Sequence, residues 1–218
     1  MHCCPPFGRK PVVQKVAPLL LASDASSTFG LGAVQASVSQ SVARSVMSHR
    51  LSQWERVTVG APHHSPKART LLSHPVHLEI PASDFKIIVR TRLSDGDHIN
   101  VREVRTIYAV VKWLARTTRW SGCVAAVLVD STFALDPACK GRSGNKQKNH
   151  LLHKMLTISI ASQASVRVDF TPTEWNLADF QSRGAPLPLT SLERWERRNR
   201  RFEAALRRSA NISLALVP

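Results

Sequence analysis

Apolar residues follow two different spacings along this chain, and the first spacing predicts strands. Residues 18–26 form an apolar run that ends in small and polar residues, which is typical of a buried strand. After a tight turn, glycines alternate with larger residues over residues 29–38, so the two segments predict a β-hairpin. Rough alternation over residues 43–59 predicts a further antiparallel strand, and residues 85–93 predict another.

Residues 100–118 show the second spacing, which is that of a helix packed on a sheet. Asn100 is a favourable N-cap, and Glu103 stands three residues later, as in a capping box. Glu103 also shares a helical face with Ile107 and Leu114, so a carboxylate begins an apolar stripe. A cap and a functional role explain this carboxylate equally well from the helix alone.

The second half of the chain predicts alternating strands and helices. Residues 123–131 are almost uninterrupted aliphatics ending at Asp130, which indicates a buried strand followed by a short helix. A second helix is predicted from near Lys146, then a strand over residues 165–173, then a helix capped by Asn176. The predicted core side of the second helix consists of Leu151, Leu152, Met155, Leu156 and Ile158.

Changes in composition divide the chain into three parts. We expect a basic, Pro-containing leader over residues 1–17, one domain over residues 18–184, and a Pro-rich linker with a basic C-terminal helix over residues 185–218. Within the domain, residues 60–83 hold four prolines and four histidines without periodicity and predict a loop insertion. Of the acids, only Glu79 is near these histidines, so a surface loop is favoured over a metal site.

The charge balance narrows the classes of partner. Lys and Arg number 30 against 15 acids, a net charge of +15 with a pI near 10.8, which points to a polyanion such as nucleic acid. No apolar stretch reaches 18 residues, so no membrane span is predicted. The four cysteines form no C-x-x-C pair, which indicates reduced thiols in an intracellular protein, either cytoplasmic or nuclear.

Four of the acids occupy conspicuous places: Asp24 ends a strand, Glu103 opens the main helix, Asp130 ends a strand, and Asp179 lies in the first turn of a helix. Singly, each has an ordinary explanation as a turn, cap, strand-end or helix-dipole residue. Clustered acids repel one another, and a divalent cation such as Mg²⁺ with its preference for carboxylate oxygens would relieve that repulsion.

These segments resemble the type 1 ribonuclease H domain, most closely that of DIRS-like, gypsy-like or Pao-like retroelements. The resemblance covers residues 18–184 and is closest to the retroelement versions in the HIN-x-x-E segment and the N-x-A-D-x-x-S-R ending. The matching segments are SDASSTFGLGAV (23–34), DHINVREVRTIYAVVKWL (97–114), VLVDSTFAL (127–135), GRSGNK (141–146) and TPTEWNLADFQSR (171–183).

The resemblance implies an α/β, RNase H-like fold, in which a mixed five-stranded sheet is flanked by helices. It implies that Asp24, Glu103, Asp130 and Asp179 are catalytic and hold two Mg²⁺ ions, with Mn²⁺ as an alternative. The implied reaction is hydrolysis of the RNA strand of an RNA–DNA hybrid, leaving a 3′-hydroxyl and a 5′-phosphate. One ion activates the attacking water, and the other stabilises the departing 3′-oxygen.

The resemblance also implies partners. Binding of the hybrid would use basic and polar side chains to hold phosphates, with little sequence preference. A reverse transcriptase polymerase domain would precede this domain in a longer polyprotein. The stretch before Asp179 lacks the histidine that the family often has there, which predicts slower turnover. The candidate nucleic-acid contacts are Lys140, Arg142, Asn145, Lys146, Lys148, Lys154 and Arg183.

Two other functions stay open at this point. The chain could be a catalytically degenerate module that only binds nucleic acid or supports a polymerase, although the presence of all four acids favours an active enzyme. An integrase-like protein is less favoured, because integrase relatives place their glutamate last, whereas Glu103 comes second here.

Overall fold

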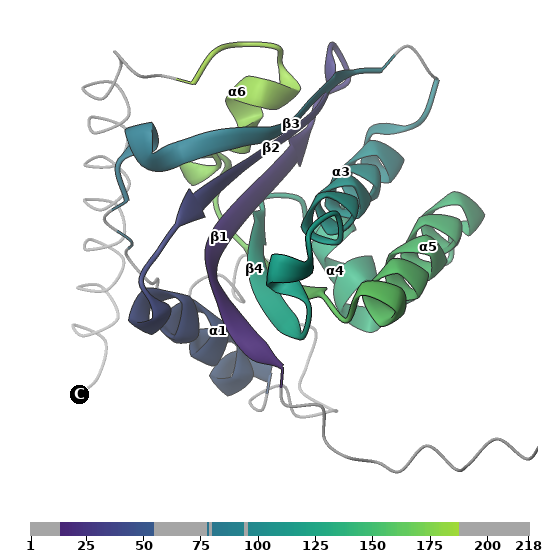
Figure 1. The fold of residues 1–218 in the computed structure, drawn as a ribbon. Coiled ribbons are helices and arrows are strands. Elements are labelled where there is room, and N and C mark those ends of the chain that lie inside the picture. The colour runs from purple at the N-terminus through teal and green to yellow at the C-terminus, as the bar shows by residue number, and fades with distance from the viewer. Residues whose placement is uncertain (1–13, 55–77, 79, 94–95, 188–218) are drawn as a thin grey trace, which may run out of the picture.

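A mixed sheet forms the centre of the computed structural model, which describes residues 14–54, 78, 80–93 and 96–187 (Figure 1). The predicted C-terminal helix, residues 1–13 of the predicted leader, and residues 60–77 and 79 of the predicted insertion lie outside the described residues. The sheet has five strands in the order β3-β2-β1-β4-β5. Their bounds are β1 Lys15–Ala25, β2 Gly30–Ser37, β3 Phe85–Arg92, β4 Cys123–Val129 and β5 Ser165–Phe170.

The strand directions divide the sheet at β1. Strands β1, β2 and β3 pair antiparallel, with a short turn between β1 and β2 and a long connection that contains α1 between β2 and β3. Strands β1, β4 and β5 pair parallel and are joined through helices. The mixed five-stranded sheet predicted from the sequence is therefore confirmed, as are the hairpin and the strands in β3, β4 and β5. β1 begins three residues before the strand expected from Pro18.

Pro18 causes a local irregularity in the central strand. Val16 pairs with Val124 and Leu20 with Ala126, so β1 contains two more residues than β4 between these paired positions. Pro lacks the N–H that a central strand needs, and it is therefore tolerated at a bulge of this kind. Beyond the bulge the register is regular, with Ala22 opposite Leu128.

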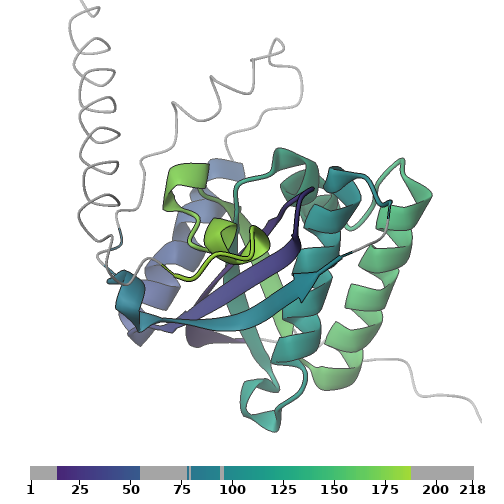
Figure 2. The same cartoon turned by 90° about the horizontal axis from the view of Figure 1, so that it is seen from above.

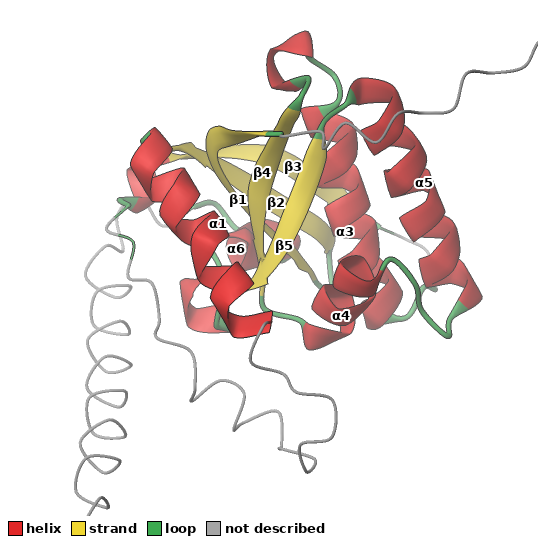
Figure 3. Ribbon diagram, turned by 90° about the horizontal axis from the view of Figure 1, so that it is seen from below, coloured by secondary structure: helices red, strands yellow, loops and turns green. Residues whose placement is uncertain are grey.

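Helices cover both faces of the sheet (Figures 2 and 3). One face packs against α3 (Ile99–Leu114), α4 (Thr132–Lys140) and α5 (Lys146–Ser162) in the largest apolar cluster. The other face packs against α1 (Gln40–Trp54) and α6 (Ala178–Ser182). None of the described helices is long and apolar enough to cross a membrane. Three short 3-10 helices span Ala82–Asp84, Thr118–Trp120 and Thr173–Trp175.

The strand predicted over residues 43–59 is wrong, because residues 40–54 form helix α1. Its buried residues are Ala43, Val46 and Met47, which are spaced i, i+3 and i+4 and place one apolar face on Leu20 and Ala126. The spacing fits a helix better than the alternation that the sequence suggested.

Details of three predicted helices differ. His98, and not Asn100, caps α3, since the His98 Nδ1 accepts a hydrogen bond from the Asn100 backbone N–H. Glu103 therefore lies beyond the capping position, and the capping-box interpretation is wrong. In α5, Leu156 was expected in the core but is 60% exposed. In α6, the N-cap is Leu177 and not the predicted Asn176, although the Asn176 Oδ1 accepts a hydrogen bond from the Ala178 N–H at the start of the helix.

Candidate metal site

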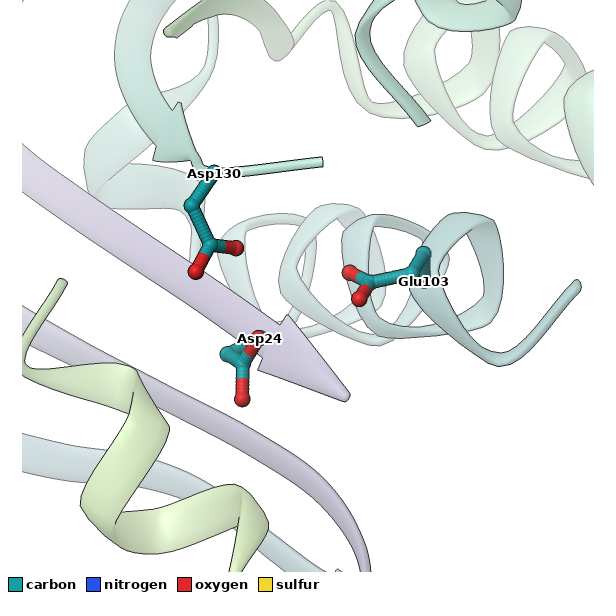
Figure 4. Close-up of side chains that lie close together, drawn as sticks. All are labelled: Asp24, Glu103 and Asp130. Carbon is teal, nitrogen blue, oxygen red and sulfur yellow. The ribbon is translucent and has the colours of Figure 1, made fainter. Parts of the chain in front are cut away.

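Three carboxylates meet at one end of the sheet (Figure 4). Asp24 lies near the end of β1, Glu103 lies in α3, and Asp130 directly follows β4. Each offers a carboxylate oxygen that lies within 4.8 Å of the corresponding oxygens of the other two. Three of the four acids singled out in the sequence are thus brought together from segments far apart in the chain.

The parallel pairing of β1 and β4 produces this convergence. Ala22 lies opposite Leu128, so the residues two positions further along, Asp24 and Asp130, leave the sheet side by side. Parallel strands carry their carboxyl ends to the same edge, where ligands commonly bind in α/β sheets. Glu103 reaches the same point from the first half of α3, which packs across β1 and β2.

Burial and mutual repulsion disfavour the charged forms of these acids. Glu103 is 7% exposed, and desolvation together with the charges of Asp24 and Asp130 raises its pKa to about 9. Desolvation also raises the pKa of Asp24 to about 7, with Asp130 and Asp179 adding repulsion. The backbone N–H of Ala25 lowers both pKa values without offsetting these causes.

The donor set fits a divalent cation. All three groups offer hard oxygen ligands at close quarters, which is the chemistry that Mg²⁺ and Mn²⁺ prefer. A cation would also compensate the repulsion that raises the pKa values of Asp24 and Glu103. Asp24, Glu103 and Asp130 are therefore the described residues best placed to hold such an ion.

Asp179 lies beside this group but outside it. Its charge acts on Asp24, yet it does not belong to the close group of three carboxylates in the described part of the chain. Its Oδ1 instead accepts a hydrogen bond of 2.7 Å from the Nε of Arg183, four residues later. Arg183, a predicted nucleic-acid contact, is thus paired with an acid of the site.

A close approach of α6 to the sheet positions Asp179. The Asn176 Nδ2 donates to the Ser23 carbonyl at 3.1 Å and ties the start of α6 to β1. Gly32, opposite Asp24 in β2, lets α6 come so near that a Cβ there would lie 2.2 Å from the Ser182 backbone nitrogen. The sequence places a glycine at that contact because any side chain would push α6 away.

Three residues that hold Asp24 in place were not among the predicted site residues. The buried Ser182 hydroxyl donates to the Asp24 carboxylate. The Thr106 Oγ1 lies 3.2 Å from the Asp24 carbonyl, and Arg102 donates to the carbonyls of Ser26 and Ser27 in the following turn. Only Ser182 had a signal in the sequence, as part of the S-R ending of the family motif.

The predicted basic contacts divide into exposed and buried residues. Lys148 is 7% exposed, and its Nζ donates to the Phe133 carbonyl at 3.0 Å. Asn145 has a structural part, because its Oδ1 accepts from the Lys148 backbone N–H and caps α5. Exposed positions are occupied by Lys140, Arg142, Asn145, Lys146, Lys154 and Arg183.

Lys148 is buried and lies within range of the charge of Glu103. Burial lowers the pKa of its ammonium group, and the charge of Glu103 acts in the opposite direction. Lys140 and Arg142 share one hollow with Gly144 after α4. The basic side chains therefore form a rim near α4 and α5, while Lys148 belongs to the interior of the site.

Comparison with known proteins gives only a distant likeness, to solved structures. No protein-family model and no curated protein matches the chain. The N-terminal RNase H domain of Rv2228c from Mycobacterium tuberculosis, determined as a fusion with maltose-binding protein, is 18% identical, with a TM-score of 0.40. The match covers 77% of this chain and 91% of that chain. A match at this level is too distant to carry an inference about activity.

Proposed function

We propose that this chain is a divalent-metal-dependent endonuclease that hydrolyses the RNA strand of RNA–DNA hybrids. The observation that carries the proposal is the convergence of Asp24, Glu103 and Asp130, whose carboxylate oxygens lie within 4.8 Å of one another at the end of parallel strands. The charge of Asp179 acts on Asp24, which supports its inclusion as a fourth acid of the proposed site. The resemblance of these segments to ribonuclease H supports the choice of reaction.

Residues of α3, α6 and the two parallel strands form and orient the proposed cation site. Asp24, held by Ser182 from α6 and by the Ala25 N–H, lies between α3 and α6. Glu103 and Asp130 complete the cation site. Divalent ions bound there would polarise water and neutralise charge on the phosphodiester. Burial of Asp24 and Glu103 keeps bulk water from the carboxylates and strengthens their pull on a cation.

Substrate binding follows from the basic rim. The exposed side chains of Lys140, Arg142, Lys146 and Lys154 would hold phosphates of the hybrid beside the acids. Phosphate contacts position a duplex without reading its sequence, so cleavage should show little base preference. We further propose that the chain acts in retroelement reverse transcription inside the cell, next to a polymerase domain of the same polyprotein.

A cleavage assay tests the proposal. Purified chain is incubated with a hybrid carrying end-labelled RNA, in Mg²⁺, in Mn²⁺ or in chelator, beside Asp130→Asn and the control Asp84→Asn. Asp84 is an exposed acid of the segment before β3, so the control makes the same chemical change away from the site. We expect metal-dependent cutting of the RNA strand by the wild type and the control, and none by Asp130→Asn.

Other outcomes have definite meanings. Cutting by Asp130→Asn at the wild-type rate would remove Asp130 from the site. Binding of the hybrid without cutting in either metal would favour a degenerate module that only binds nucleic acid.

A further inference from the structure

Asp179, the fourth acid of the proposed site, forms an ion pair with Arg183 of the same chain. Asp179 lies in the first turn of α6 and Arg183 directly follows the helix, four residues later, and the Nε of Arg183 donates to the Asp179 Oδ1 at 2.7 Å. The carboxylate of Asp179 is 24% exposed and the guanidinium side chain 61% exposed. The pair therefore lies at the mouth of the site, where both solvent and a substrate can reach it.

We propose that Arg183 is an internal counter-ion that occupies Asp179 in the free protein and releases it when a substrate phosphate takes the guanidinium. The inference rests on the proposed function, because it assigns the order in which the site acquires its cations. The close group of Asp24, Glu103 and Asp130 is ready for a first ion. Asp179 becomes available for a second ion only after Arg183 has moved.

The electrostatics of Arg183 support this role. Hydrogen bonding and charge from Asp179 raise its pKa, and the charges of Asp24 and Asp130 act in the same direction. The guanidinium thus faces three of the four acids. A unit positive charge about 5 Å from a divalent ion weakens binding of that ion by about tenfold or more in a partly exposed site. Arg183 and a second ion therefore compete for Asp179.

The chemistry of arginine explains why a substrate phosphate can displace Asp179 from the guanidinium of Arg183. A guanidinium binds phosphate oxygens through two parallel hydrogen bonds, and that interaction is stronger than a single bond to one carboxylate oxygen. The hydrogen bond in the structure uses Nε, so the side chain keeps further N–H donors for such a contact. An exposed ion pair is also cheap to break, since such pairs contribute about 1 kcal/mol or less.

Counting bound Mn²⁺ by electron paramagnetic resonance, without nucleic acid, tests the first half of the inference. The proteins compared are the wild type, Arg183→Gln, Arg183→Lys and the control Arg116→Gln, which removes an exposed arginine beyond the far end of α3. Because Asp179 is freed, Arg183→Gln should bind a second ion at least about fivefold more tightly than the wild type. Arg183→Lys keeps the charge and should resemble the wild type, as should Arg116→Gln.

Equal affinities and equal counts of Mn²⁺ in the wild type and Arg183→Gln would overturn the inference. A gain that Arg183→Lys shares would also overturn it, since it would reflect shape rather than charge. Arg183→Met provides the same test if Arg183→Gln does not fold by circular dichroism. The proposed function fails separately, if the wild type binds no Mn²⁺ and Asp130→Asn changes nothing.

Binding of an RNA–DNA hybrid in chelator tests the second half. Asp179→Asn frees Arg183 and should tighten binding of the hybrid, whereas Arg183→Gln should weaken it by a few fold beyond Arg116→Gln. In a protein that already carries Arg183→Gln, adding Asp179→Asn should tighten binding of the hybrid much less than it does in the wild type. The guanidinium that Asp179→Asn would release is absent from that protein. Full additivity of the two substitutions would show that Arg183 and Asp179 do not exchange partners.

Discussion

The buried face of α3 has two halves that differ in polarity, because only the first half buries polar side chains. In the first half, the buried side chains are Val101 and Val104 together with three polar ones, Arg102, Glu103 and Thr106, and Arg102 and Thr106 donate to carbonyls of β1 or of the turn after it. In the second half they are aliphatic, as in Val110 and Leu114, which are completely buried in the main apolar cluster. One helix therefore supplies both a piece of the site and a piece of the core.

The contrast separates the sources of stability from the sources of function. Each aliphatic side chain in the second half gains about 1.5–3 kcal/mol from leaving water. Glu103 in the first half is desolvated beside Asp24 and Asp130, so its charged form is unfavourable until a cation arrives. The first half is locally costly for the metal-free fold, and this is the pattern expected of a functional site.

The largest expected effect comes from the polar half. Glu103→Gln keeps the volume and removes one charge from the proposed cation site, so cleavage of a hybrid should fall by about a thousandfold or more. Initial rates at saturating Mg²⁺ measure the loss, and circular dichroism confirms the fold. A loss of less than tenfold would place Glu103 outside the chemistry and break the comparison.

The apolar half should show the reverse result. Leu114→Ala removes a completely buried side chain at the end of α3 and should lower the free energy of unfolding by about 2–5 kcal/mol. Urea denaturation measures the change. Below the melting temperature of the variant, the specific rate of cleavage should stay within about threefold of the wild type. Leu114 lies at the other end of α3 from Glu103, and a loss of packing there should not change the geometry of the site. A large loss of activity in folded protein would contradict the division of α3.

The sequence predicts the parts of this molecule that depend on local pattern. The aliphatic runs around Leu20 and Val127 predict buried strands, and the stripe through Ile107 predicts α3, because each pattern reports the face that is buried. The pattern fails where two periods coincide. Residues 43–54 alternate roughly, yet Ala43, Val46 and Met47 have the spacing of a helix, and packing on Leu20 decides between them.

The site divides in the same way. Glu103 is visible in the sequence because a carboxylate interrupts an apolar stripe. The contacts that Ser182 and Arg102 make are not visible there, because their partners, Asp24 and Ser26, lie 158 and 76 residues away in the chain. The burial of Lys148 is hidden for the same reason, since it depends on the Phe133 carbonyl of another helix. Local pattern locates the acids, and only the tertiary fold reveals what orients them.

Gly32→Ala tests whether α6 must lie close to the sheet for the polar half to work. The new Cβ would meet backbone atoms of Ser182 and Ala178, so α6 has to move, at a cost of about 1–3 kcal/mol in unfolding free energy. Movement of α6 withdraws Ser182 and Asp179 from Asp24, so cleavage should fall more than stability alone explains. Gly96→Ala is the control, because its Cβ would meet nothing within 4 Å and it lies outside the basic rim. Equal activities in folded samples of the two variants would contradict the role of this contact.

The smallest expected effect concerns the stability of metal-free protein, and it carries the opposite sign from the loss of activity. Burial raises the pKa of Glu103 to about 9 in the folded state, well above the ordinary value of a glutamate, so between these two pKa values the folded state binds more protons than the unfolded state. Stability in chelator should therefore fall as pH rises from about 5 to 9, and Glu103→Gln should remove part of that slope. At pH 8 the variant should be more stable than the wild type, and near pH 4.5 most of that difference should be gone. Melting curves in chelator at both pH values measure this, and a variant less stable than the wild type at pH 8 would show that Glu103 supports the fold as the apolar half does.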